Sequence, residues 1–187
     1  MRRILETEQR LCNRLDRLPD DYDFATKGFR TPEAKLDDLI FGASEYAKDG
    51  LLPLTEWFGP SPWSDRMMGL VDDVWAHAPS ETEVGKIPST SHEVAGDLMQ
   101  SLSRLYWMTK NPVYRDLAVK LADYFLLHHL PIQDAALRFN DHGCEVINGL
   151  SEVYYIASKT LPDKHAAWRE NMHAILDRSL EVGVDAA

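Results

Sequence analysis

The chain has 187 residues, of which 44% are hydrophobic, so it is long enough to bury the core of about one domain. Its 30 acidic and 20 basic residues give a formal charge of -10, which argues against nucleic acid or an anionic membrane as the main partner. It has two cysteines in unlike contexts, no apolar run long enough to span a membrane and no apolar leader, which together favour a reducing, cytoplasmic setting.

Helical periodicity dominates the first part of the chain, and strand alternation is nearly absent. Thr31 and Ser61 are each followed by proline, which is typical of an N-cap and the first position of a helix. We predict helices over residues 2–17, 31–50 and 62–77, an apolar and aromatic connection over 51–60, and a loop over 78–90.

The second part of the chain contains an internal repeat. Residues 95–108 align with residues 143–156 at a shift of 48, with an acid at the same place in both copies (Asp97 and Glu145). A second amphipathic segment follows each copy, which indicates two stacked helical hairpins. We predict their helices over residues 92–110, 112–129, 143–160 and 164–182. The expected fold is a single all-α domain over 1–187, in which 1–31 form an N-terminal helix and link and 32–182 form helical hairpins.

The first helix of each repeated hairpin is expected to be the inner one. These helices carry few charges after their first turn and contain Gly96 and Gly149. A glycine inside a helix costs about 1 kcal/mol relative to alanine, so it usually indicates close packing. Alternating inner and outer helices build either an α-solenoid or a closed α/α toroid.

Two blocks that open the inner helices, SHEVAGDL at 91–98 and DHGCEVINGL at 141–150, resemble the six-hairpin glycosidase-like superfamily. The resemblance implies part of an (α/α)6 toroid and a role in hydrolysis or elimination at a glycosidic bond, with an oligosaccharide or glycoside as substrate. A complete ring has six hairpins, more than we predict here. We therefore expect an incomplete toroid, completed by self-association or by a missing C-terminal half.

In such toroids the cleft lies where loops enter the inner helices. The candidate catalytic residues are the carboxylates Asp97, Asp141 and Glu145, with His142 as a further proton-handling group. The candidate substrate-binding residues are His92, Glu93, Trp57 and Trp63. Glycoside hydrolysis usually needs two carboxyl groups about 5–9.5 Å apart, and neighbouring helices pack at about 8–10 Å. Asp97 is thus expected to face Glu145, or Glu93 to face Asp141.

Structural roles compete with these functional ones. Glu93 completes a capping box with Thr90, and Asp141 is a suitable N-cap. The aromatic residues commonly pack in a core or lid. No metal-ligand spacing and no cofactor motif is present, so neither a metal nor a cofactor is predicted. Two alternatives to an enzyme stay open: a non-catalytic incomplete toroid that binds a glycan or a protein through its concave face, and an α-solenoid scaffold.

Overall fold

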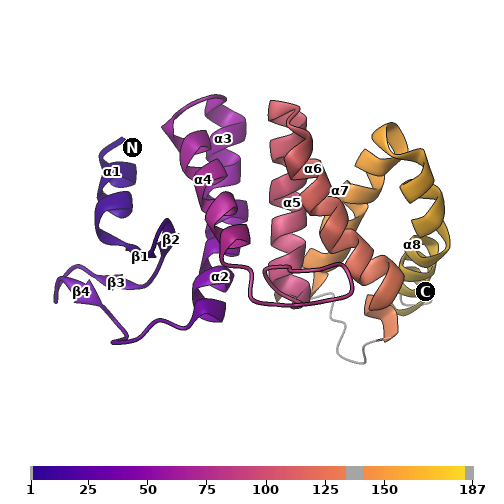
Figure 1. Cartoon of the computed structure of the whole chain (residues 1–187), viewed down its shortest axis with the longest axis horizontal. Helices are drawn as coiled ribbons and strands as arrows, with labels where there is room; N and C mark the ends of the chain where they lie inside the picture. Colours follow the sequence, from indigo (N-terminus) through magenta and orange to yellow (C-terminus); the bar gives the residue numbers. More distant parts are fainter. Residues whose placement is uncertain (1, 134–140, 184–187) are drawn as a thin grey trace. The chain divides into compact units, whose positions relative to one another are not determined.

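A computed structural model describes residues 2–133 and 141–183, without the side chains of residues 133, 141, 142, 182 and 183. The chain divides into two compact units, residues 1–79 and 80–187, and each is described by itself. Most described residues are helical (Figure 1), which confirms the all-α prediction. That the whole chain forms a single domain, and that its hairpins form part of a toroid, both stay predictions.

The first unit begins with an irregular segment and ends with packed helices. Helix α1 is followed by two small antiparallel sheets, one formed by β1 and β2 and the other by β3 and β4. Helix α2 continues through a π-helical turn into α3, and α4 packs on both. The bounds are α1 Arg2–Leu11, β1 Asn13–Leu15, β2 Leu18–Pro19, β3 Tyr22–Asp23, β4 Gly28–Phe29, α2 Leu36–Glu45, the π turn Tyr46–Leu51, α3 Leu52–Phe58 and α4 Pro62–Ala76.

Three sequence predictions for this unit were wrong. The first helix ends at Leu11 instead of residue 17, because the chain reverses at Asp16 (φ 46°) and buries Leu18 completely. No helix begins at Thr31, whose carbonyl, like that of Pro32, accepts a hydrogen bond from the Arg14 guanidinium. The 51–60 connection is largely helical, since Pro53 lies in the first turn of α3, where its missing N–H is tolerated.

The start of α4 follows the prediction. The Ser61 backbone N–H donates to the Ser64 hydroxyl (2.8 Å), and that hydroxyl donates back to the Ser61 carbonyl (2.7 Å). Proline occupies the first helical position, as expected.

A buried guanidinium holds the irregular segment to α4. Arg66 is only 2% exposed, and it forms an ion pair with Glu8 and donates to the Asn13 side chain and the Arg17 carbonyl. The Arg17 guanidinium in turn donates to both carboxylate oxygens of Asp73 (2.7 and 2.8 Å). These buried and half-buried charges therefore hold the irregular segment to α4.

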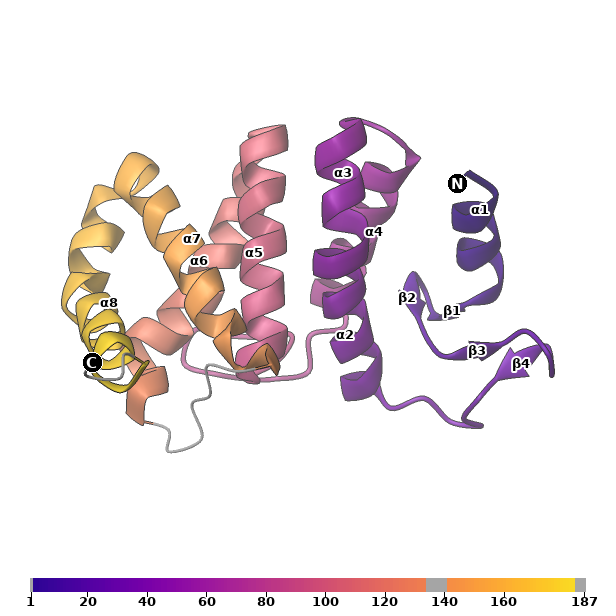
Figure 2. The same ribbon diagram turned by 180° about the vertical axis from the view of Figure 1, so that it is seen from behind.

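The second unit consists of two helical hairpins, α5–α6 and α7–α8 (Figures 1 and 2). Its helices agree with the predicted ranges to within a few residues at each end. The bounds are α5 His92–Thr109, α6 Pro112–Asp123, the π turn Tyr124–His128, the 3-10 turns Pro131–Gln133 and Asp141–Cys144, α7 Glu145–Thr160 and α8 Pro162–Gly183. Before α5, Ser80 and Ile87 form an isolated antiparallel bridge within the predicted loop.

The inner helices α5 and α7 approach so closely that two glycines are required. A Cβ atom at Gly96 would lie 2.2 Å from the Glu145 carbonyl carbon, and one at Gly149 would lie 2.8 Å from the Gly96 oxygen. The predicted close packing is confirmed.

Residues 48 positions apart face each other along this contact. The Arg104 guanidinium donates to both carboxylate oxygens of Glu152 (2.9 Å each), and the Trp107 and Tyr155 rings lie 6.1 Å apart. The repeat shift is therefore the step from one inner helix to its parallel neighbour.

Candidate functional site

A cavity of about 320 Å³ lies beside the first turn of α5, at the end of the inner helix where the sequence predicted a cleft. Its lining comes from the loop before α5, from α5 itself and from the π turn with the residues that follow it. These residues are Thr90, His92, Tyr124, Phe125, His128, His129, Leu130 and Pro131.

Ring contacts fix the aromatic wall of this cavity. The His92 ring meets the edge of Phe125 (5.5 Å between centroids), and Phe125 meets Tyr124 edge-on (5.0 Å). His129 stacks on Tyr124, with centroids 4.3 Å apart and planes at 28°. The π turn makes this stacking possible, because the His129 N–H bonds the carbonyl of Tyr124, five residues earlier.

A carboxylate supports the cavity from one side. A carboxylate oxygen of Glu83 lies 3.3 Å from His129 Nε2. The pKa of Glu83 is lowered, mainly by a hydrogen bond from the backbone N–H of Glu83 and next by the hydrogen bond with the His129 imidazole. Burial, and then the negative charge of Glu83, raise the pKa of Tyr124, although a hydrogen bond with Thr90 opposes them. The Tyr124 hydroxyl therefore stays protonated at neutral pH and is able to donate a hydrogen bond.

Of the predicted site residues, His92 lines the cavity and the inner-helix carboxylates are buried beneath the surface. Asp97 is 0% exposed and Glu145 6%, and the Gln100 amide donates to the Glu145 carboxylate (2.6 Å). Glu93 is half-buried in the first turn of α5. The side chains of Asp141 and His142 fall outside the described residues.

The two predicted aromatic subsite residues lie in the first unit. Trp57, near the end of α3, is 84% exposed, and Trp63, at the start of α4, is half-buried. Neither is among the residues that line the cavity beside α5.

Sequence reasoning missed Thr90, Tyr124 and His129 as cavity residues. His128 and His129 lie at the end of the helix predicted over residues 112–129, and no role in a site was predicted for them. The π turn that directs Tyr124 and His129 together has no clear signature in the sequence, because it depends on how the helix end packs.

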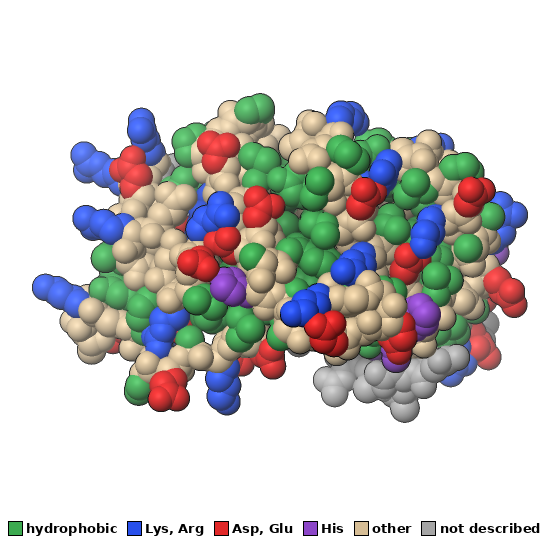
Figure 3. Space-filling view, viewed as in Figure 1, with side chains coloured by type: hydrophobic (Ala, Val, Ile, Leu, Met, Phe, Trp, Pro, Cys, Tyr) green, Lys and Arg blue, Asp and Glu red, His purple; other side chains and the backbone are tan. Residues whose placement is uncertain are grey.

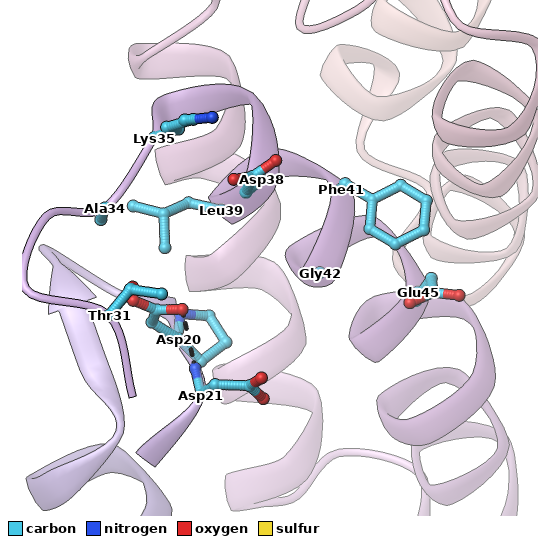
Figure 4. A pocket seen from close by; sticks show the side chains of 11 residues that line it. Asp20, Asp21, Thr31, Ala34, Lys35, Asp38, Leu39, Phe41, Gly42 and Glu45 are labelled. Atoms are coloured by element: carbon cyan, nitrogen blue, oxygen red, sulfur yellow. Dashed lines mark hydrogen bonds between the residues drawn. The ribbon is translucent and has the colours of Figure 1, made fainter. Parts of the chain in front are cut away.

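A second cavity, of about 550 Å³, lies in the first unit beside α2 (Figure 4). Four carboxylates and one lysine line it, together with apolar side chains such as Leu39 and Phe41; the charged residues are Asp20, Asp21, Asp38, Glu45 and Lys35. The Arg14 guanidinium lies 3.5 Å from the Asp20 carboxylate, and the Arg30 guanidinium lies 3.8 Å from the Asp21 carboxylate. Part of the negative charge of the cavity is therefore neutralised within the unit.

Among the described residues, no cluster of three or more histidine, cysteine, aspartate or glutamate side chains could hold a metal ion. None of the described helices is both long and apolar enough to cross a membrane. Acidic and basic side chains are mixed over the face in Figure 3.

Comparison with known family models, with curated proteins and with solved structures finds no match to this chain. The likeness to the six-hairpin glycosidase-like superfamily thus depends on the two sequence blocks alone.

Proposed function

We propose that this protein binds a saccharide in the cavity beside α5 and does so without cleaving it. The observation that supports this proposal is that one cavity combines the stacked Tyr124–His129 wall with hydrogen-bonding side chains such as those of Thr90 and His92. The C–H face of a sugar ring packs against an aromatic wall, while its hydroxyl groups exchange hydrogen bonds with hydroxyl and imidazole groups. The cavity volume of about 320 Å³ is at the lower end for small-ligand sites, which suits one or two sugar rings.

Burial of the inner-helix carboxylates favours binding over hydrolysis. A general acid or base must come within hydrogen-bond distance of the reacting group. Asp97 is completely buried and Glu145 already accepts a hydrogen bond from Gln100, so neither carboxylate is offered to a ligand in this arrangement.

The test is a calorimetric titration with a panel of neutral mono- and oligosaccharides. We expect one or more members to bind, and His129→Ala to weaken that binding at least ~tenfold, which corresponds to about 1.4 kcal/mol. The matched control is His165→Ala, which removes an equivalent stacked pair. The rings of His165 and Tyr154 have centroids 4.3 Å apart and planes at 27°, and neither residue lines the cavity. Absence of binding across the panel, or equal loss in both variants, would refute the proposal.

A glycoside hydrolase-like activity is the second candidate. It is favoured by the close approach of α5 and α7 at Gly96, which brings two acid-bearing helix starts together. Release of reducing sugar from oligosaccharides by the wild type, lost in Glu145→Gln with unchanged thermal stability, would support it. Saccharide binding without turnover would exclude it for the sugars tried.

A further inference from the structure

The last turns of α5 and α7 carry a row of aromatic rings that the saccharide cavity does not use. Both helices end on the same side of the second unit (Figures 1 and 2), whereas the cavity lies beside the first turn of α5. The Trp107 ring lies 5.5 Å from the Tyr106 ring and 6.1 Å from the Tyr155 ring, measured between centroids. The row therefore joins the two helices, and 57% of the surface of Tyr155 is exposed.

A lysine ammonium group lies over each of the two rings that face each other across the helices. Lys110 Nζ is 4.7 Å from the centroid of the Trp107 ring, and Lys159 Nζ is 5.2 Å from that of the Tyr155 ring. Both distances are within the range of a cation–π interaction, which restricts where each ammonium group sits. We refer to Trp107, Lys110, Tyr155 and Lys159 as the lysine–aromatic patch.

The charges of the two lysines are available to a partner, unlike those of the neighbouring arginines. Arg104 is paired with Glu152, and Arg115 is paired with Asp116. Within the described part of the chain, neither lysine of the patch forms such an ion pair. A helix C-terminus carries about half a negative charge, so each ammonium group leaves a positive remainder at its helix end. The patch is thus locally positive in a chain whose formal charge is -10.

We propose that the lysine–aromatic patch binds an acidic peptide segment of a partner protein. Two carboxylates of the peptide pair with the two ammonium groups, and an apolar side chain between them packs on the exposed surface of Tyr155. Aromatic side chains often dominate binding at interfaces. Rings that are already held by neighbouring rings also lose little conformational entropy when a ligand covers them.

The number and placement of the cations favour a peptide over other partners. Two lysines are fewer than the clusters of about four to eight basic residues that hold proteins on anionic membranes. The formal charge of -10 opposes the long-range attraction on which nucleic-acid binding depends. Salt screens charges beyond about 8–10 Å, so a short acidic segment at contact responds mainly to the patch. A lysine already covers one face of each ring, which restricts the flat stacking of a sugar.

The first experiment is a calorimetric titration of the full chain with a capped peptide in which glutamates flank a single leucine. We expect this peptide to bind, and the same peptide with glutamine in place of glutamate to bind at least ~tenfold more weakly. Combining Lys110→Gln with Lys159→Gln should weaken binding of the acidic peptide by at least ~tenfold as well. The matched control combines Lys27→Gln with Lys35→Gln, which removes the same charge at exposed positions of the first unit. No binding of the acidic peptide, or equal losses in the two double variants, would overturn the proposal.

Substitutions at Tyr155 test the aromatic part of the patch with the same acidic peptide. Tyr155→Ala removes both the packing surface and the ring that holds Lys159, so binding should weaken by at least ~fivefold. Tyr155→Phe keeps the ring and should bind within about twofold of the wild type. If Tyr155→Ala binds the peptide as tightly as the wild type, or if both substitutions weaken binding equally, the proposed arrangement is wrong.

Anionic vesicles distinguish a peptide from a membrane as the partner of the patch. We expect no cosedimentation of the chain with vesicles of phosphatidylserine and phosphatidylcholine. Cosedimentation that is lost in the variant without Lys110 and Lys159, combined with no binding of the acidic peptide, would assign the patch to membranes and overturn the proposal. Circular dichroism melts establish beforehand that every variant remains folded.

Discussion

The two units of this chain are stabilised in different ways. In the second unit, α5 and α7 pack at nearly backbone contact, with Gly96 and Gly149 at the closest points. In the first unit, the segment before α2 is fastened to α4 by the buried Arg66 and by the Arg17–Asp73 pair. Both kinds of contact join residues distant in the chain. The close packing depends on small residues along regular helices, whereas the charged contacts depend on side-chain groups that pair with an irregular segment. The comparison predicts that the two units fail under different substitutions.

The largest effect is expected from Arg66→Met in the first unit. The substitution leaves Glu8, whose side chain is 16% exposed, without its guanidinium partner, and it removes the donors to Asn13 and to the Arg17 carbonyl. Breaking a buried ion pair costs about 3–5 kcal/mol, so urea denaturation should show a loss of that size. Arg2→Met, in a pair with 84% and 59% exposed side chains, is the control and should change stability by less than about 0.5 kcal/mol. Similar losses in both variants would show that the burial of Arg66 is unimportant.

Gly96→Ala should be the most damaging small change in the second unit. The new methyl group would lie 2.2 Å from the Glu145 backbone, so the two helices must separate. Overpacking of this kind costs about 3 kcal/mol, to be measured as a decrease in the free energy of unfolding. Gly42→Ala, in α2, meets no atom within 4 Å and should instead stabilise the chain by up to about 1 kcal/mol. A neutral Gly96→Ala would mean that α5 and α7 are further apart than described.

Acid should weaken the first unit through Asp73. Hydrogen bonds from the Arg17 guanidinium are the main cause that lowers the pKa of Asp73, so its ionised form stabilises the folded state. That contribution is fully present above the unfolded aspartate pKa of about 3.9 and is lost as the pH falls through the lower folded value. Denaturation of wild type and Asp73→Asn at a series of pH values should therefore give stabilities that converge below about pH 4. A difference between the two that stays constant with pH would contradict this assignment.

The smallest effect is expected for the Arg104–Glu152 pair between α5 and α7. Its side chains are 45% and 24% exposed, and such surface pairs contribute about 0.5 kcal/mol. A double-mutant cycle with Arg104→Ala and Glu152→Ala measures this coupling, which should decrease as salt is added. A coupling energy as large as the Gly96→Ala loss would show that charge also stabilises the second unit.

The same contrast explains which parts of the sequence analysis succeeded. The four helices of the repeat were predicted within a few residues, because Asn111–Pro112 and Leu161–Pro162 separate regular apolar patterns. The glycines also correctly indicated that α5 and α7 pack closely. In the first unit the predicted helix over 2–17 was too long, since an apolar pattern over Leu11 and Leu15 is compatible with either a helix or a turn and strand.

The candidate site was only partly predictable. His92 was expected near the cleft because it begins an inner helix, and it does line the cavity. Tyr124 and His129 were not expected, because they come together only where a helix ends in a π turn. The burial of Asp97 and Glu145 was likewise open, since a carboxylate near a helix start suits a surface role as well as a buried one.

The sequence by itself determined the helical class, the repeat and the step of 48 residues that relates α5 to α7, because these depend on local periodicity and on residue size. Only the tertiary structure decided which carboxylates are buried, how Arg66 fastens the first segment, and which side chains surround the cavity beside α5. Those features depend on contacts between residues distant in the chain, whose partners local patterns do not specify.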